Sequence, residues 1–155
     1  MIYRNIEIKI IDLVNYINLA KINLSPVFQR GRVWNIKLRQ KLLQNMIEGK
    51  PIPAIFLYKK ESGETYTYNI LDGKQRIESL ILFIGNERHN LKIDGWNQYF
   101  FSKADRKNVN FAIEANNTKT RFRDLSEEKV RAFGEYVIPT VEITMGEDTE
   151  LSEII

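Results

Sequence analysis

The chain has 155 residues, 43% of them hydrophobic, and 23 lysines and arginines against 20 aspartates and glutamates give it a formal net charge of +3. This length and composition suit a single soluble domain, and we expect a cytoplasmic protein, because no apolar run approaches a membrane span and no signal-peptide pattern begins the chain. The chain has no cysteine and the single histidine His89, which excludes disulfides and cysteine nucleophiles and argues against histidine-rich metal sites and Ser-His-Asp catalysis.

The charges are distributed unevenly along the chain. The segment Phe28–Lys50 holds six cations and one carboxylate, a net charge of +5, whereas Asp124–Ile155 holds nine carboxylates and two cations, a net charge of −7. The basic segment predicts an anionic partner such as a nucleotide or a nucleic acid. The alternative is an ordinary solvated helix face. The six cations are Arg30, Arg32, Lys37, Arg39, Lys41 and Lys50.

The first elements are a short strand, a helix and a structured loop. Isoleucines alternate with charged residues from Ile6 to Ile10, which predicts a strand, and helical spacing then predicts a helix over Ile11–Ala20. In the segment Leu24–Trp34, Pro26 favours an extended entry, Gly31 allows a turn, and Trp34 supplies an apolar anchor. The same segment presents three polar residues, which are Gln29, Arg30 and Arg32.

A second helix and a hairpin follow. Asn35 is a good N-cap for a helix over Ile36–Glu48, and Gly49 and Pro51 end it. We predict an apolar stripe of Leu38, Leu42, Met46 and Ile47 on this helix. Two short apolar runs around the turn Glu61–Glu64 predict a β-hairpin over Ile55–Leu71, central in the sheet.

The hairpin leads into a sharp corner between strand and helix. Asp72-Gly73 ends the apolar run, and helical spacing resumes at Ile77, so Asp72 is placed to cap the helix. Lys74 and Arg76 then fall in the first helical turn, where the helix dipole disfavours cations unless an anion lies in front of them. The corner is therefore a candidate phosphate site, and the alternative is a capped corner with two solvated cations.

The second half of the chain gives weaker patterns. We expect the corner helix to end near Gly85, followed by a short strand over Leu91–Ile93 and a polar helix between Ser102 and Ala115 that Asn116-Asn117 breaks. Ser126 predicts the N-cap of a helix that ends near Glu135. The last expected elements are a strand over Val137–Ile143, at a sheet edge because it contains Pro139, and the start of an amphipathic helix over Glu150–Ile155. We interpret 1–155 as a single domain truncated at its C-terminus.

Three blocks of the chain resemble the N-terminal domain of GmrSD-type, modification-dependent restriction enzymes. The blocks are Pro26–Arg30 with Val33-Trp34, then Gly49–Pro53, and then Leu71–Arg76, which corresponds to the family motif Asp-Gly-Gln-Gln-Arg. A weaker fourth block is Phe122–Leu125 with Tyr136–Pro139. The resemblance covers most of the chain from about Asp12 onward. It implies a ParB/sulfiredoxin-like α+β fold with a small mixed sheet and packed helices.

The chain departs from the family pattern in three places. Lys74 replaces the first glutamine of the motif, which adds a potential phosphate contact. The chain ends before the family's Phe-x-Arg-Ile-Asn segment, and it contains nothing like the HNH-type nuclease domain of full enzymes. The resemblance thus implies the nucleotide-handling, sensing part of a restriction system, with the nuclease in another domain or subunit.

The resemblance also implies specific roles. The family binds or hydrolyses nucleoside triphosphates and couples this to cleavage of modified phage DNA, so an NTPase activity and DNA as a partner are expectations for the full-length protein. Arg30 and Arg76 fit phosphate-binding forks. In the same role, Lys74 and Arg32 add charge, and Gly73 opens the helix start. Gln75 or Gln29 fits a water-orienting catalytic role, and Asp72 fits a Mg²⁺ ligand or simply the N-cap.

Two other interpretations remain open. The first is a non-enzymatic DNA-binding or partner-docking module, based on the charge of Phe28–Lys50. The second is a structural subdomain whose basic face meets the acidic segment of another copy. Chemistry of the sulfiredoxin type is excluded because it needs a cysteine.

Overall fold

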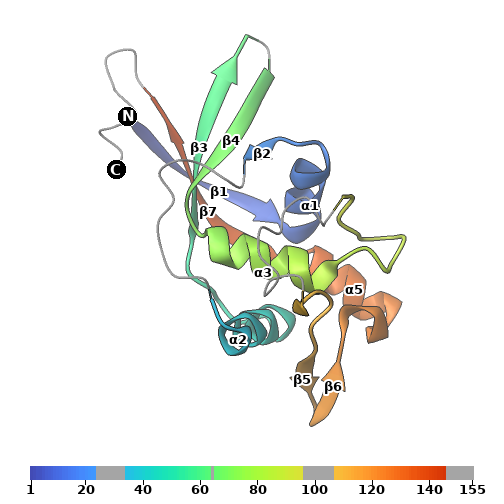
Figure 1. Ribbon diagram of the computed structural model, residues 1–155. Helices are drawn as coiled ribbons and strands as arrows, with labels where there is room; N and C mark the ends of the chain where they lie inside the picture. Colours follow the sequence, from blue (N-terminus) through green and yellow to red (C-terminus); the bar gives the residue numbers. More distant parts are fainter. Residues whose placement is uncertain (24–33, 64, 96–106, 146–155) are drawn as a thin grey trace.

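The computed structural model describes residues 1–23, 34–63, 65–95 and 107–145 of the chain (Figure 1). Its central feature is a mixed sheet with the strand order β1-β7-β3-β4-β2. The strands are β1 (Ile2–Lys9), β2 (Ile22–Asn23), β3 (Ile55–Ser62), β4 (Thr65–Asp72) and β7 (Val137–Thr144). Two pairings, β3 with β7 and β2 with β4, are parallel and the others are antiparallel. The expected α+β class with a mixed sheet is confirmed.

Helices pack around this sheet, and a small second hairpin lies beyond them (Figure 1). The α-helices of the described part are α1 (Ile10–Asn18), α2 (Ile36–Ile47), α3 (Lys74–Ile84) and α5 (Glu127–Gly134), with a short 3₁₀ helix η2 (Phe122–Asp124) before α5. The second hairpin consists of β5 (Ile113–Ala115) and β6 (Thr118–Thr120). No helix in the described ranges is long and apolar enough to cross a membrane.

One face of the sheet forms the core. Ile8 of β1, Leu57 of β3 and Ile70 of β4 are almost fully buried, whereas Tyr3 on the opposite face is 57% exposed. The same core face holds a polar pair in which the hydroxyl of Tyr68 donates to Oε2 of Glu142 at 2.6 Å. Burial and this hydrogen bond raise the pKa of the Tyr68 hydroxyl above its ordinary value, which keeps it protonated as the donor.

Helix α3 lies in the centre of the molecule. Every residue from Ile77 to Ile84 is buried, so the second half of the helix is covered all round. The ring of Phe83 packs against those of Phe111, Phe122 and Phe133, with centroids 5.4, 5.6 and 6.0 Å away. These contacts join α3 to η2 and α5 and make the helix the element on which the other layers pack.

Three predicted helix ends are confirmed. The side chain of Asn35 accepts a hydrogen bond from the Leu38 N–H, and that of Ser126 accepts one from the Lys129 N–H, as expected for N-caps. Helix α3 ends at Gly85, which has a positive φ. Local capping chemistry was therefore sufficient to place these ends.

The predicted position of the last strand is wrong. Strand β7 lies between β1 and β3, inside the sheet, although it contains Pro139. The parallel ladder with β3 starts at Thr140, one residue after the proline. A residue without an N–H is tolerated there because the ladder on that side has not yet begun.

Two further expectations are corrected. Leu91–Ile93 is not a strand, and Ile113–Ala115, expected at the end of a polar helix, is strand β5. Asn116 and Asn117 have φ values of 52° and 63° and form the two-residue turn between β5 and β6. Asparagine tolerates positive φ, so the Asn-Asn pair indicates a hairpin and not a helix break.

The start of the expected polar helix and the C-terminal segment Glu150–Ile155 lie outside the described residues.

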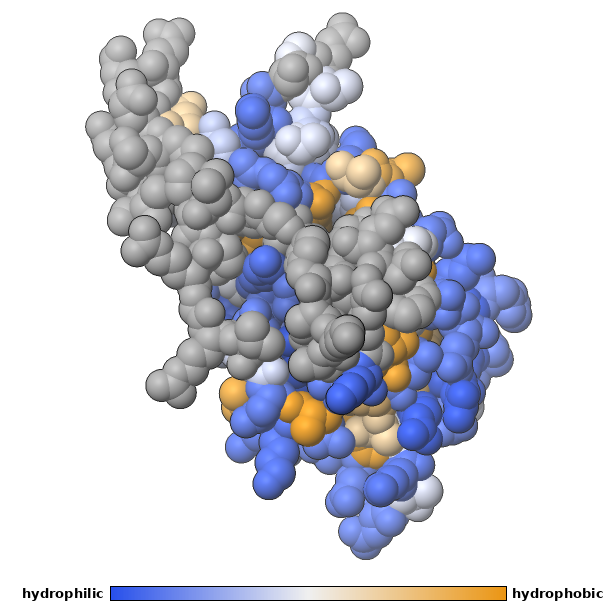
Figure 2. Space-filling model, viewed as in Figure 1, coloured by the Kyte–Doolittle hydropathy of each residue, from blue (hydrophilic) through white to orange (hydrophobic). Residues whose placement is uncertain are grey.

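The buried face of α2 is rotated from the predicted one. Leu38 is 48% exposed, whereas Arg39 is completely buried together with Leu43. Figure 2 accordingly shows hydrophobic residues at the surface in the region of α2. The rotation follows from polar partners that α3 supplies to Arg39, as described below.

This rotation gives a stability prediction. Leu43→Ala should lower the free energy of unfolding by about 2–5 kcal/mol, because it empties a fully buried site. Leu38→Ala, the same change on the same helix, should cost less than about 0.5 kcal/mol because the side chain is half exposed. Chemical denaturation of both variants measures the difference, and equal losses would contradict the assigned face.

Candidate functional site

Three separate segments of the chain meet at the start of α3. The side-chain oxygen Oε1 of Gln75 accepts a hydrogen bond from the Trp34 N–H at 3.0 Å. The guanidinium of Arg76 donates through Nη2 to the carbonyl oxygen of Ala54 at 2.7 Å. Trp34 ends the segment Leu24–Trp34, and Ala54 follows the two prolines after α2. The corner therefore joins stretches about 20 and 40 residues apart in sequence.

The corner itself turns on Gly73. This residue has φ +104° and serves as the N-cap of α3, so the prediction that Asp72 caps the helix is wrong. A Cβ at Gly73 would lie 2.5 Å from Cγ2 of Ile55 and 3.3 Å from Nη2 of Arg76. Only glycine fits this conformation and this close approach. Because glycine has no side chain, residue 73 does not cap the first N–H groups of the helix.

Arg76 is the cation of the corner with the least exposed surface. Its side chain is 14% exposed, and Nη2 lies 3.9 Å from Oδ2 of Asp72 in addition to its bond to Ala54. The Nε atom is buried and has no hydrogen-bond partner among the described residues. A buried donor without a partner is costly, so the Nε–H is available to donate a hydrogen bond to a further acceptor group.

A group of buried charges lies behind the corner. Arg39 from α2 is completely buried, and its Nη2 lies 3.6 Å from Oε2 of Glu78, whose side chain is 8% exposed. The other oxygen of Glu78 lies 3.8 Å from Nζ of Lys74. One buried carboxylate thus faces two cations, and Lys74 is directed toward this group and is only 20% exposed.

Arg39 also holds the first turns of α3 through hydrogen bonds. Its Nη1 donates to the backbone oxygen of Gln75 at 3.2 Å and to Oγ of Ser79 at 2.9 Å, and its Nη2 donates to Oε1 of Gln75 at 3.0 Å. Oε1 of Gln75 therefore accepts two hydrogen bonds, from Arg39 and from Trp34. A catalytic role in which this oxygen orients a water molecule would require breaking one of them.

The burial of Arg39 changes the interpretation of the basic segment. Arg39 does not contribute to the surface, and Lys50 pairs with Glu48 at 2.8 Å. Lys37 and Lys41 remain exposed on α2. The surface charge of this segment is smaller than the sequence suggested, which weakens the case for a nucleic-acid face on α2.

Asp72 is the exposed carboxylate of the corner, with 66% of its side chain accessible. Among the described residues no group of three or more His, Cys, Asp or Glu side chains could hold a metal ion. One carboxylate still fits Mg²⁺, because this ion commonly uses one or two carboxylates together with waters and substrate phosphates. Asp72 thus fits a Mg²⁺ that arrives with a phosphate ligand and does not fit a permanent metal site.

Three predicted residues remain outside this geometry. Gln29, Arg30 and Arg32 lie outside the described residues. Trp34, which follows them in sequence, is partly buried and packs against the hydrophobic core. Its predicted role as an apolar anchor is confirmed.

The comparison with protein families is decisive for identity. The family model described as GmrSD restriction endonuclease, N-terminal domain, matches residues 10–154. The chain belongs to this family. It is therefore a component of a restriction system. Searches of curated proteins and of solved structures gave no significant match.

Described residues within or next to the three blocks that resemble GmrSD domains lie at the start of α3. Trp34 belongs to the first block, Ala54 directly follows the second, and Asp72–Arg76 is part of the third. The hydrogen bonds of Gln75 and Arg76 join the third block to Trp34 and to Ala54. Among the described residues, these parts of the chain thus meet at one place.

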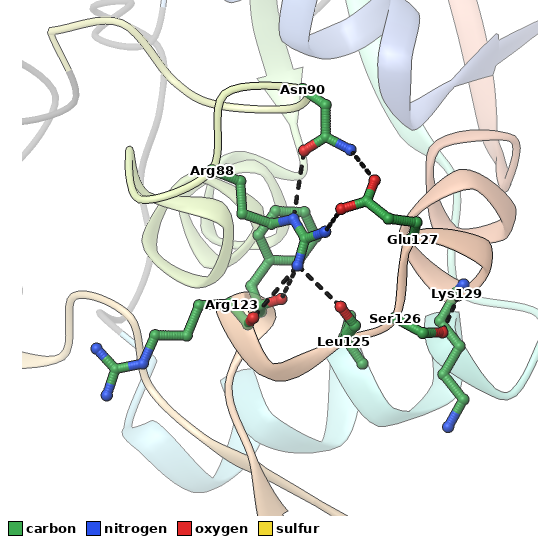
Figure 3. A network of polar contacts seen from close by, with 8 residues as sticks. Arg88, Asn90, Arg123, Leu125, Ser126, Glu127 and Lys129 are labelled. Carbon is green, nitrogen blue, oxygen red and sulfur yellow. Dashed lines mark hydrogen bonds and ion pairs between the residues drawn. The ribbon is translucent and has the colours of Figure 1, made fainter.

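Two arginines of this domain were missed in the sequence. Arg39 stands three, four and seven residues before Leu42, Leu43 and Met46, which is the spacing of a buried helix face and could have revealed it. The second is Arg88, whose Nη1 donates to the backbone oxygen of Leu125 at 2.8 Å and which also contacts Asn90 and Glu127 (Figure 3). Arg88 connects the segment after α3 to the start of α5. No local sequence pattern predicts this role.

A cavity in the described part of the chain lies away from the corner. It has a volume of about 460 Å³ and lies between the end of α2, the β5–β6 hairpin and α5. Its lining combines apolar residues such as Met46 and Phe133 with the carboxylates of Glu48, Glu114 and Glu135. Carboxylates disfavour phosphate, so this cavity does not compete with the corner as a nucleotide site.

The geometry of Gly73 can be tested with a matched pair of variants. Gly73→Ala should lower the free energy of unfolding by about 3 kcal/mol, because positive φ and the contact with Ile55 both oppose a Cβ. Gly49→Ala also has positive φ but meets nothing within 4 Å, so it should cost about 1 kcal/mol. Thermal and urea unfolding give both values. Similar losses would show that the close approach at Gly73 is unimportant.

Proposed function

We propose that this domain binds a nucleoside triphosphate at the start of α3 and acts as the regulatory or sensing domain of an anti-phage, modification-dependent restriction system. The observation that supports the proposal is that Trp34 from the first block and Ala54, next to the second, are hydrogen-bonded to Gln75 and Arg76 of the third. Motif residues that are distant in sequence and adjacent in space are typical of a ligand site. The fold we propose is ParB/sulfiredoxin-like.

The phosphate contact in this proposal centres on Arg76. Its Nε is buried without a partner among the described residues, so a phosphate oxygen would supply the missing acceptor. The N–H groups at the start of α3 and the helix dipole favour an anion at the same place. Lys74 adds positive charge, although it is shared with Glu78. Gly73 keeps the approach to the helix start open, since it has no side chain.

The segment before Trp34 supplies the other proposed contacts. Arg30 and Arg32 stand four and two residues before Trp34 in sequence. The Trp34 N–H donates a hydrogen bond to Oε1 of Gln75 at the corner. We assign both arginines to the phosphates on this basis. Since Oε1 of Gln75 already accepts two hydrogen bonds, Gln29 is the better candidate for orienting a water if the domain hydrolyses its nucleotide.

Mg²⁺ and further partners complete the proposal. Asp72 would hold Mg²⁺ directly or through water, and the ion would neutralise phosphate charge. A nuclease domain or subunit and DNA are the partners we propose for the full-length protein. The alternative, a DNA-binding or docking module without nucleotide, rests on the exposed Lys37 and Lys41 of α2 and is an outcome of the test below.

Calorimetric titration with GTP, CTP, UTP and ATP in the presence of Mg²⁺ tests the phosphate site. Arg76→Gln should weaken the binding of nucleotide by about 10- to 100-fold, as expected for the loss of charge-assisted hydrogen bonds. Arg123→Gln is the matched control, because Arg123 is exposed and pairs with Glu87 far from the corner along the chain. It should leave binding unchanged.

The folded state of each variant is checked by circular dichroism, since Arg76 also holds Ala54. Unchanged nucleotide binding in a folded Arg76→Gln variant would refute the assignment of the site. Wild-type protein that binds no nucleotide but binds duplex DNA, with an affinity that falls steeply with salt, would favour the alternative.

A second titration tests the role of Asp72. Asp72→Asn should remove the dependence of nucleotide binding on Mg²⁺ and leave the unfolding temperature nearly unchanged, because the carboxylate is exposed and does not cap the helix. Asp124→Asn provides a control at another exposed aspartate. If the Mg²⁺ dependence of Asp72→Asn matched that of the wild type, the metal role would be wrong.

A further inference from the structure

Strand β1 forms one edge of the main sheet. It is eight residues long and pairs with β7 on one side, and within the described part of the chain no strand pairs with its other side. Its register with β7 is continuous from Ile2 opposite Thr144 to Lys9 opposite Val137. Proteins commonly protect such edges with proline, a bulge or a very short strand, and β1 has none of these.

The charges on β1 are also largely neutralised. Nη2 of Arg4 donates to Oε1 of Glu142 at 2.8 Å, and Glu142 is buried inside the sheet. Nζ of Lys9 donates to Oε2 of Glu135 at 2.6 Å. Unpaired charges are another means of blocking edge-to-edge association, and two of the three charges of this strand are paired within the protein.

Exposed apolar side chains gather at both ends of the strand. Ile2 and Tyr3 at its start are 61% and 57% exposed, and Met1 is 40% exposed. At its other end Ile11 and Val137 are each 39% exposed, and Val137 lies opposite Lys9 in β7. Tyr3 and Val137 project from the same face of the sheet, because Tyr3 and Lys9 are separated by an even number of residues.

We propose that β1 pairs antiparallel with β1 of a second copy of this chain, so that the two sheets join into one continuous sheet. A two-fold axis perpendicular to the sheet places the apolar start of each strand against the apolar end of the other strand. A surface with apolar groups at both ends and neutralised charges between them is complementary to itself. This interface is independent of the proposed nucleotide site.

The charge pattern also selects the register. In such a pairing the axis passes through one residue, which faces its own copy. An axis at Arg4 or Glu7 would place identical charges opposite each other, which is destabilising. An axis at Ile6 places Tyr3 opposite Lys9 of the other copy, beside its Val137, and Glu7 opposite Asn5. An axis at Asn5 also avoids like charges, but only the axis at Ile6 brings Tyr3 of one copy next to Val137 of the other, and we assign the axis to Ile6 for this reason.

Light scattering coupled to size-exclusion chromatography tests the interface. The wild-type chain should have the mass of two chains, and the double variant Ile2→Lys/Tyr3→Lys should have the mass of one with an unchanged unfolding temperature. Leu19→Lys/Leu38→Lys is the matched control, because both leucines are exposed and lie away from β1, and this variant should remain dimeric. A monomeric wild type, or a dimer that survives the changes in β1, would overturn the proposal.

A cysteine variant tests the register. The chain has no cysteine, so Ile6→Cys introduces a single thiol that would face its own copy. Mild oxidation should yield a disulfide-linked dimer that a reductant separates, whereas Thr118→Cys on the exposed strand β6 should yield none. Equal cross-linking of the two variants, or none with Ile6→Cys, would overturn the assigned register.

Discussion

The guanidinium of Arg39 lies wholly inside the protein, and the arrangement around the start of α3 depends on satisfying it. A buried charge is tolerated only with opposite charge and hydrogen bonds nearby. Gln75, Glu78 and Ser79 supply both, and their spacing of i, i+3 and i+4 places them on one face of α3. Helix α2 is thereby fixed in rotation against α3, and Gln75 is fixed in the orientation that binds Trp34. The buried contacts of Arg39 thus determine the arrangement of the residues at the candidate site.

Elements controlled by local chemistry could be predicted from the sequence. The caps Asn35 and Ser126 and the glycine end of α3 depend on residues within one helical turn, and their expected positions were correct. Errors arose where distant partners decide. Leu38 was expected in the core because it is apolar, but the polar partners of Arg39 rotate the helix and expose Leu38. Pro139 was expected at an edge, but its place beside β3 depends on where a neighbouring ladder begins.

The candidate site shows the same division. The corner at Asp72-Gly73 and the positions of Lys74 and Arg76 in the first turn of α3 follow from periodicity and turn chemistry. What these side chains contact does not. Lys74 is directed toward Glu78, and Gln75 bridges α2 and Trp34, so two residues read as ligand contacts have internal partners. Polar residues in a motif have both structural and binding uses, and only the three-dimensional contacts separate them.

The complete burial of the second half of α3 has a mechanical consequence. An α-helix of eleven residues is about 16 Å long and is stiff along its axis. The burial of every residue from Ile77 to Ile84 opposes bending of this part of the helix. There the backbone oxygen of Leu82 accepts from the Asn110 N–H, and the following segment carries Arg88, which holds the start of α5. The helix therefore connects the Gly73 corner to the segment that holds the start of α5.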